Sequence, residues 1–260
     1  MREEKSFSSF FFTIITVCYN SEKTIRDTFE SLLNQSFKDF QYIVIDAKSK
    51  DKTLDYIKDY QSKFKSKGIS FKYITEKDNG IYDAMNKGIR MSIGKWIGIL
   101  NSDDIYEKDT LNIVKSFISL NLTSEVVFGN MTTINSKLQK ALLLKDSNIK
   151  DIRNEMCISH PSVFIKKNIY DRFGLYNTNY KIVADWELLK RFHLENVNFQ
   201  YLNKNLSFFK LGGVSSNYSY LYLKERISVR HKNLKWNFFI YDLNDLLRFA
   251  LSKIKLFIHL

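Results

Sequence analysis

The stretch that decides the fold is FFFTIITV at residues 10–17, a continuous run of apolar and β-branched side chains. Such a run is typical of a strand that is buried on both faces, as in a parallel sheet. We predict two further strands of this kind, QYIVI at residues 41–45 and WIGIL at residues 96–100. Because parallel strands need helices over both faces of their sheet, the sequence predicts an α/β fold.

Segments with helical spacing separate these strands. After residues 20–21, apolar side chains recur at offsets 0, 4, 7 and 8, the spacing of one helix face: Ile25, Phe29, Leu32 and Leu33. We predict further helices from Thr53 and over residues 81–91, with a short strand at residues 71–74 between them. This alternation predicts βαβ units and a mixed, mostly parallel central sheet flanked by helices.

The pattern loosens beyond residue 104. We predict a helix around residues 111–118, strands at residues 125–128 and 162–165, and a helix over residues 185–193. From residue 222 onward, helical spacing produces an apolar stripe: Trp236, Phe239, Ile240, Leu243, Leu247, Ala250, Leu251, Ile254 and Ile258. Basic residues accompany it: Lys224, Arg226, Arg230, Lys232, Lys235, Arg248, Lys253 and Lys255. We therefore expect an α/β domain at residues 10–216 and a basic amphipathic helical extension at residues 217–260.

The net charge indicates which partners suit the chain, and the cysteine content indicates the redox state of its compartment. Forty Lys and Arg against 28 Asp and Glu give a net charge of +12, which favours anionic partners or reflects a general lysine bias. Cys18 and Cys157 stand in no CxxC motif, so we expect no zinc site, a buried free thiol at Cys18 and a reducing compartment. The start has no signal-peptide pattern, and no 18-residue uncharged apolar stretch predicts a spanning helix.

Polar residues follow the predicted strands where each strand ends. They are Tyr19 and Asn20, then Asp46, then the LNSDD segment at residues 100–104. Ligands bind at the carboxyl ends of the strands in open α/β sheets, so we expect these side chains to lie close together. Adjacent carboxylates repel each other unless a cation compensates them, and oxygen ligands suit Mg²⁺ or Mn²⁺. The alternative for LNSDD is a polar turn that caps the next helix.

Seven segments in order resemble the inverting glycosyltransferases of family 2, which have the GT-A fold. The chain is similar in particular to bacterial members that build colanic-acid-like and other surface polysaccharides, over residues 11–216. The segments are IITVCYN (14–20), IVIDAKSKD (43–51), EKDNGIYDAMNKGI (76–89), GKWIGILNSDD (94–104), ISHPSVF (158–164), VADWELL (183–189) and FKLGGVSS (209–216). The resemblance implies a nucleotide-sugar donor, a glycan or lipid-linked acceptor, and Mn²⁺ or Mg²⁺ as cofactor.

The resemblance also implies roles at the donor site. LNSDD is similar to the DXD-type motif of the family, with Asn101, Ser102 and Asp103 at its three positions and Asp103 as the metal ligand. Asp104 would support this site from behind or contact the donor sugar. Asp46 looks like the first Asp of the family's DDGS stretch, near the nucleobase or ribose. The chain departs from that stretch at Ala47 and Lys48, which puts the choice between uridine and guanosine in doubt.

The GIYDAMNKG segment resembles the helix that approaches the nucleotide in these enzymes. Asp83 is the donor-binding candidate there, with Asn86 and Lys87 as further candidates. The alternative for Asp83 is an acidic residue that the dipole of a helix favours at the helix start.

The VADWELL segment carries the proposed catalytic base, because an inverting transfer needs a carboxylate to accept the proton of the acceptor hydroxyl. By resemblance this base is Asp185, with Trp186 as a platform for a sugar. Glu187 is the alternative base, but the two carboxylates diverge by about 200° on a helix and do not reach the same proton. An N-cap is the alternative role for Asp185. His160 and the glycines Gly212 and Gly213 would border the acceptor or the leaving diphosphate, or serve structure alone.

Three rival functions are weighed against a sugar transferase. A nucleotidyltransferase usually has a Gly-rich loop with an arginine after its first strand, where this chain has CYNSE at residues 18–22. A non-catalytic binder of nucleic acid or another anionic ligand would fit the charge, but the acids cluster at the strand ends, so we expect no nucleic acid partner. Asn101 and Ala47 raise the alternative of an inactive relative, against which stands the presence of Asp103 and Asp185.

The basic C-terminal segment has two interpretations. A basic amphipathic helix lies on anionic membranes, which would place the protein in the cytoplasm and peripherally on the inner face of the membrane. In the other interpretation, the apolar stripe packs against the catalytic domain. Both interpretations could hold for different parts of the segment.

Overall fold

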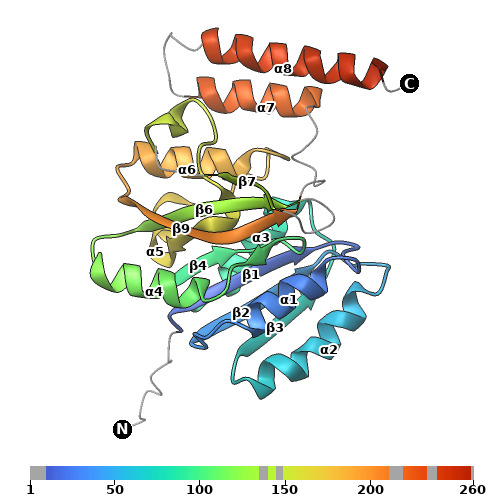
Figure 1. Ribbon diagram of the computed structural model, residues 1–260, viewed down its shortest axis with the longest axis vertical. Coiled ribbons are helices and arrows are strands. Elements are labelled where there is room, and N and C mark those ends of the chain that lie inside the picture. The colour runs from blue at the N-terminus through green and yellow to red at the C-terminus, as the bar shows by residue number, and fades with distance from the viewer. Residues whose placement is uncertain (1–9, 135–139, 145–148, 211–218, 233–238, 259–260) are drawn as a thin grey trace.

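A computed structural model describes residues 10–134, 140–144, 149–210, 219–232 and 239–258. Its centre is a nine-stranded sheet with the strand order β3-β2-β1-β4-β8-β6-β9-β5, and β7 pairs with β6 (Figure 1). The strands are β1 (Phe12–Cys18), β2 (Phe40–Asp46), β3 (Ser70–Thr75), β4 (Trp96–Ile99), β5 (Ile105–Tyr106), β6 (Val126–Ile134), β7 (Lys140–Leu144), β8 (Val163–Lys166) and β9 (Phe199–Lys210). The predicted mixed α/β architecture is confirmed.

Helices cover both faces of this sheet. They are α1 (Ile25–Leu33), α2 (Thr53–Ser66), α3 (Ile81–Met91), α4 (Thr110–Leu120), α5 (Lys167–Phe173), α6 (Ala184–Leu194), α7 (Tyr220–His231) and α8 (Phe239–Ile258), with short 3₁₀ turns η1 (Ile149–Arg153) and η2 (His160–Ser162). Side chains of α1, α2 and α4 pack in one core cluster, and those of α3, α5 and α6 pack in the other. The two clusters are the two faces of the sheet.

The first half of the sheet follows the sequence pattern closely. Strands β1, β2, β3 and β4 pair in parallel, and every residue of β1, β2 and β4 is buried. Continuous apolar runs form such strands because helices cover them on both faces. Cys18, at the end of β1, is a buried free thiol as predicted.

The second half of the sheet is less parallel than the sequence predicts. Strand β8 is antiparallel to β4, β6 is antiparallel to β8 and β7, and β5 is antiparallel to β9, so that only the pair β6 and β9 is parallel among the described strands of this half. The twelve-residue β9 is absent from the sequence predictions. Its sequence, FQYLNKNLSFFK, contains two Lys and two Asn, and its long pairing with β6 stabilises it instead of a local apolar pattern.

The C-terminal helices attach to the rest of the chain in different ways. On α7, Glu225 accepts hydrogen bonds from the backbone N–H groups of residues 181–183, and Val229 belongs to the main core. Helix α8 lies outermost at one end of the molecule, with α7 between it and the rest of the described chain (Figure 1). At the described positions of the predicted stripe, α8 exposes Ile240, Leu243, Leu247 and Leu251. These side chains do not pack against the catalytic domain; Trp236 lies outside the described residues.

A close backbone contact at Gly94 provides a test of how the start of β1 packs. A Cβ atom at Gly94 would lie 2.4 Å from backbone atoms of Phe12 and Thr13. Backbone atoms of a paired strand cannot move aside as a flexible side chain could. We expect Gly94→Ala to lower the free energy of unfolding by about 1–3 kcal/mol in urea denaturation. Gly68→Ala is the control, because its Cβ meets open space and only the left-handed backbone, at φ 71°, adds about 1 kcal/mol. An unchanged stability of Gly94→Ala would contradict the contact.

Candidate active site

The loops that follow β1, β2 and β4 meet at one edge of the sheet, as predicted. The backbone N–H of Asn20 donates to Ser49 Oγ (2.9 Å), and the N–H of Lys50 donates to Asn20 Oδ1 (2.8 Å). The hydroxyls of Ser21 and Ser102 lie 2.8 Å apart. These hydrogen bonds join three segments that are far apart in sequence. Tyr19, in the first loop, is exposed.

The LNSDD segment forms a tight turn at this edge. The N–H of Asp104 donates to the carbonyl of Asn101, and Thr28 Oγ1 of α1 donates to the carbonyl of Asp104 (2.8 Å). The Asp104 side chain is fully buried, and one of its oxygens accepts a hydrogen bond from Asn101 Nδ2 (3.3 Å). Asp104 therefore lies behind Asn101, which favours a supporting role over direct contact with a donor sugar. Asp103 is half-buried.

The two carboxyl groups of this turn carry charge that the described residues hardly compensate. Burial raises the pKa of Asp103, although the charge of Lys210 opposes this. Burial raises the pKa of Asp104 well above its usual range, and the adjacent charge of Asp103 raises it further. Two buried polar atoms here, Asn101 Oδ1 and Asp104 Oδ1, have no hydrogen-bond partner among the described residues. A divalent cation at Asp103 would relieve this repulsion, so the residues present fit Mn²⁺ or Mg²⁺.

The described residues alone do not enclose a metal ion. Among them, no three His, Cys, Asp or Glu side chains form a group that could hold one. This agrees with a Mg²⁺-type site in which one or two carboxylates bind and substrate phosphates complete the coordination.

Asp46 is fully buried at the end of β2. Its carboxylate accepts hydrogen bonds from Ser49 Oγ (2.5 Å), the N–H of Ser49 and Thr75 Oγ1 (2.6 Å). It holds the loop that follows β2, so the structure gives it a positioning role, and its place near the nucleobase or ribose stays a prediction. Lys48, where the family usually has Gly, adopts the left-handed backbone at φ 59°. That conformation explains why glycine suits this position.

Helix α3 brings Asp83 to the same edge, whereas the side chain of Asn86 on the same helix points into the interior. Asp83 is half-buried and accepts a hydrogen bond from the backbone N–H of Asn79 (3.0 Å), with Lys87 Nζ 3.7 Å away. Asn86 is buried, and its side chain bonds the N–H (3.0 Å) and the carbonyl (2.9 Å) of Tyr176. Both polar groups of Asn86 are thus occupied by backbone, and the prediction that it binds the donor is wrong for this structure.

Asp185 lies in the first turn of α6, next to the first turn of α3. Its Oδ1 accepts hydrogen bonds from the N–H of Trp186 (2.9 Å) and from the hydroxyl of Tyr82 (3.2 Å), which also donates to the carbonyl of Ile182 (2.7 Å). Among the described residues, none donates to Oδ2. The helix begins at Ala184, so Asp185 is not the N-cap. Its carboxylate has one oriented oxygen and one oxygen left for a ligand.

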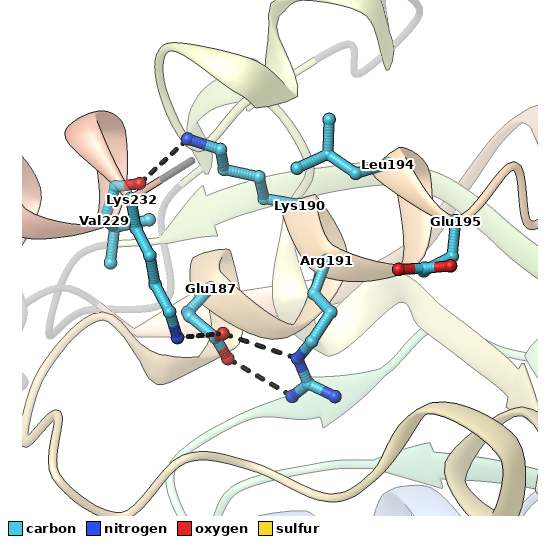
Figure 2. A pocket seen from close by; sticks show the side chains of 7 residues that line it. All are labelled: Glu187, Lys190, Arg191, Leu194, Glu195, Val229 and Lys232. Atoms are coloured by element: carbon cyan, nitrogen blue, oxygen red, sulfur yellow. Dashed lines mark hydrogen bonds and ion pairs between the residues drawn. The ribbon is translucent and has the colours of Figure 1, made fainter. Parts of the chain in front are cut away.

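Glu187, the alternative base, faces away from Asp185. Its carboxylate is almost fully buried and pairs with Arg191 (3.2 Å) and Lys232 (3.2 Å), as Figure 2 shows. Arg191 and Lys232 donate to Glu187 Oε1, and Arg191 also donates to Oε2, so both oxygens of this carboxylate are already occupied. The structure therefore favours Asp185 over Glu187 as the base.

The pocket in Figure 2 lies between α6 and the end of α7 and is not the proposed active site. It is lined by Glu187, Lys190, Arg191, Leu194, Glu195, Val229 and Lys232. Lys190 Nζ donates to the carbonyls of Val229 (2.8 Å) and Arg230 (2.9 Å) at the end of α7, and burial lowers its pKa to about 8. Lys190 thus satisfies the last carbonyl groups of α7 from α6.

Trp186 does not offer a platform for a sugar, which corrects the prediction. The residue is 1% exposed, and its Nε1–H donates to the carbonyl of Ile152 (2.6 Å). The guanidinium groups of Arg226 and Arg230 lie 5.3 Å and 5.7 Å from its ring. The sequence did not reveal this burial, because the partners of Trp186 come from segments 34 or more residues away.

His160 and two tyrosines lie behind Asp185. His160 Nε2 is 2.8 Å from the hydroxyl of Tyr176, whose ring stacks on Tyr82 at 5.4 Å. Burial lowers the pKa of His160, although the charge of Asp185 opposes this. The sequence analysis missed both tyrosines; Tyr82 stands in the GIYDAMNKG segment, directly before Asp83, which is the signal that could have found it. Gly212 and Gly213 lie outside the described residues.

The described chain thus combines a parallel βαβ half-sheet with carboxylates at one edge, the arrangement in which α/β proteins bind ligands. The family model described as "Glycosyl transferase family 2" matches residues 13–172, more than half of the chain. The chain belongs to this family and is a glycosyltransferase with the GT-A fold.

Two relatives with similar sequences are named as biosynthesis glycosyltransferases. A PGL/p-HBAD biosynthesis glycosyltransferase of Mycobacterium bovis is 29% identical over 177 residues, which cover 68% of this chain and 67% of the relative. The putative teichuronic acid biosynthesis glycosyltransferase TuaG of Bacillus subtilis is 33% identical over 99 residues, 38% of each chain.

Solved structures share the fold at lower identity. S. aureus TarS 1-349 in complex with UDP-GlcNAc superposes with a TM-score of 0.69 and 21% identity, covering 94% of this chain and 72% of that one. The mannosyltransferase PcManGT from Pyrobaculum calidifontis, in complex with GDP-Man and Mn²⁺, has a TM-score of 0.65 and 14% identity, covering 94% and 71%.

The structural role of Asn86 is directly testable. Asn86→Ala leaves the N–H and the carbonyl of Tyr176 without partners, so we expect a loss of about 1–3 kcal/mol in the free energy of unfolding. Nucleotide affinity of the folded protein, measured by calorimetry, should stay within twofold of wild type. Asn112→Ala, at an exposed position of α4, is the control and should not destabilise the protein. A large loss of affinity at unchanged stability would restore Asn86 as a donor ligand.

Proposed function

We propose that this protein transfers a sugar from a nucleoside-diphosphate sugar to a hydroxyl of a glycan or lipid-linked acceptor, with inversion at the anomeric carbon. The observation that carries the proposal is the state of Asp185, a half-buried carboxylate with one oxygen fixed by Tyr82 and the other without a donor among the described residues. The names of the relatives, which refer to PGL/p-HBAD and teichuronic acid biosynthesis, support a role in surface polysaccharide biosynthesis.

The donor would bind at the edge formed by the loops after β1, β2 and β4. TarS and PcManGT were crystallised with UDP-GlcNAc and GDP-Man, which supports a nucleotide-sugar donor here. Asp103 would hold Mn²⁺ or Mg²⁺, supported by Asn101 and Asp104 behind it. A bound divalent ion supplies compensation for the negative charge of the donor diphosphate, including the charge that develops as it leaves. Tyr19, Ser102 and Asp83 remain proposed donor contacts.

The acceptor would approach Asp185 from the side of its free oxygen. Asp185 accepts the proton of the attacking hydroxyl, while Tyr82 keeps the other oxygen in place through its hydrogen bond. The hydroxyl attacks the anomeric carbon from the face opposite the diphosphate, which inverts the configuration. His160 and Tyr176 form the wall behind this carboxylate.

The proposal also covers the division of the chain into two segments and its location at a membrane. We propose residues 10–216 as the catalytic domain and residues 217–260 as the helical extension, with the protein acting on the cytoplasmic face of a membrane. Within the described residues, no helix is both long and apolar enough to cross a bilayer. The counter-hypothesis is an inactive relative that binds the nucleotide alone, and the two tests below separate it from an active enzyme.

Removal of the proposed base should abolish transfer but not donor binding. We expect Asp185→Asn to lower kcat by about 10²–10⁴-fold, the usual contribution of a general base, with a nucleotide Kd close to wild type. Glu187→Gln is the matched control on the same helix and should keep most of the activity at a temperature where it stays folded. Transfer is measured as release of the nucleoside diphosphate from a panel of sugar donors. Equal loss of binding and transfer in Asp185→Asn would reject its role as base.

Removal of the proposed metal ligand should change donor binding only when metal is present. In a thermal-shift panel of UDP, GDP and TDP, we expect one nucleotide with Mn²⁺ to stabilise the wild type by about 2.7 kcal/mol at a hundredfold excess over Kd. Asp103→Ala should lose this shift but behave like wild type in chelator. Asp59→Ala, an exposed position on α2, controls for the lost charge. A shift that is independent of metal in both proteins would contradict the proposed metal site.

A further inference from the structure

The outer face of α8 is an apolar surface that nothing in the described chain covers. Ile240, Leu243, Leu247 and Leu251 are between 46% and 77% exposed. Their spacing of three, four and four residues places them on one face of the helix, and the exposed Leu246 flanks them. A contiguous apolar surface of this kind on a folded protein marks an interaction site.

A buried ionic cluster fixes this face outward. Asp245 pairs with Arg226 (2.8 Å) and Arg230 (2.7 Å), and Asp242 pairs with Arg230 and with His231 (2.6 Å). Arg230 and Asp245 are almost fully buried. A rotation of α8 that buried the leucines would leave these charges without partners in the interior, at a large energetic cost. The outward stripe is therefore set by the charges on the opposite face of the same helix.

The surroundings of the stripe are basic. Residues 217–260 contain eight Lys and Arg and three acids, Glu225, Asp242 and Asp245. All three acids contact α7 or residues 181–183. Among the described side chains of α7 and α8, Lys224, His231 and Arg248 are exposed and no acidic side chain is, although His231 pairs with Asp242. Lys232, directly after α7, is also exposed and pairs with Glu187. Exposed basic side chains and no exposed acidic ones therefore accompany the apolar face in the described part of α7 and α8.

We propose that α8 docks in the plane of an anionic lipid bilayer, with its exposed leucine face in the boundary between headgroups and acyl chains. Charge complementarity favours this occupant, because anionic headgroups attract the surrounding basic side chains. A second copy of the chain would bring an identical basic surface against it, in a protein with a net charge of +12. The length of α8, 20 residues, suits a helix that lies in the interface.

The docking surface is connected to the helix that carries Asp185. Arg226 and Arg230 contact α8 on one side and the ring of Trp186 on the other. Since Trp186 follows Asp185 on α6, docking would hold that carboxylate at a fixed height above the lipid surface. This consequence rests on the proposed function, whereas the docking itself does not.

The test is co-sedimentation of the full chain with vesicles. We expect the wild type to sediment with vesicles of phosphatidylcholine and phosphatidylglycerol, less at high salt, and to stay in the supernatant with phosphatidylcholine alone. Leu243→Glu with Leu247→Glu should reduce the partition coefficient by at least about tenfold, because each change removes buried apolar surface and adds a charge that the lipid repels. The single variant Ile240→Glu should reduce it in the same direction.

The matched control makes the same chemical change far from α8. Leu120 and Leu122, at the end of α4, are 84% and 82% exposed. Leu120→Glu with Leu122→Glu should therefore bind vesicles like the wild type. Thermal unfolding and the nucleotide shift are measured on every variant, so that a failure of docking is distinguished from a failure of the donor site.

Several results would overturn the proposal. The first is wild-type protein that stays in the supernatant with anionic vesicles. The second is wild-type protein that binds neutral vesicles as well as anionic ones. The third is a loss of binding that is equally large in the α8 and the α4 double variants. A fourth is a dimer that Leu243→Glu with Leu247→Glu converts into a monomer, measured by light scattering without lipid, in a chain that does not sediment with vesicles. That result would assign the face to a second copy of the chain.

Discussion

The requirement that a buried charge has a partner organises this protein more than any other constraint. Arg230, Asp245, Lys190 and Glu187 are buried, and each has a partner of opposite charge or backbone carbonyl groups. The Asp103–Asp104 pair differs, because burial opposes the charge of both carboxyl groups and Asp104 also stands beside the charge of Asp103. This uncompensated charge is the physical basis of the proposal that a divalent cation binds at Asp103.

The same constraint determines which carboxylate of α6 is available for chemistry. Glu187 is held by Arg191 and Lys232, whereas Asp185 receives hydrogen bonds on one oxygen only. It also sets the orientation of α8, because Asp242 and Asp245 turn toward the arginines of α7. The open oxygen of Asp185, the proposed base, and the outward leucine face are therefore consequences of how neighbouring charges are neutralised.

Residues at strand ends were easier to predict than residues on helices. Asp103 and the loops after β1, β2 and β4 meet as expected, since parallel strands bring their carboxyl ends to one edge. Asn86 and Trp186 lie in segments that resemble a nucleotide-binding helix and a catalytic helix, yet they point into the interior. Their direction depends on Tyr176, Ile152 and the arginines of α7, which a local pattern does not contain.

The sequence by itself determined the parallel half of the sheet, the edge where the loops after β1, β2 and β4 meet, and the family. Long apolar runs, polar strand ends and motifs are local properties of the chain. Only the tertiary structure decided the antiparallel half with β9, which of the Asp185 and Glu187 carboxylates is held by cations, and the outward face of α8. Each of these depends on pairing between segments distant in sequence: β9 with β6, Asp185 with Tyr82, and Asp245 with two arginines. Such pairings are settled by the geometry that neutralises buried polar groups, which is a property of the folded chain as a whole.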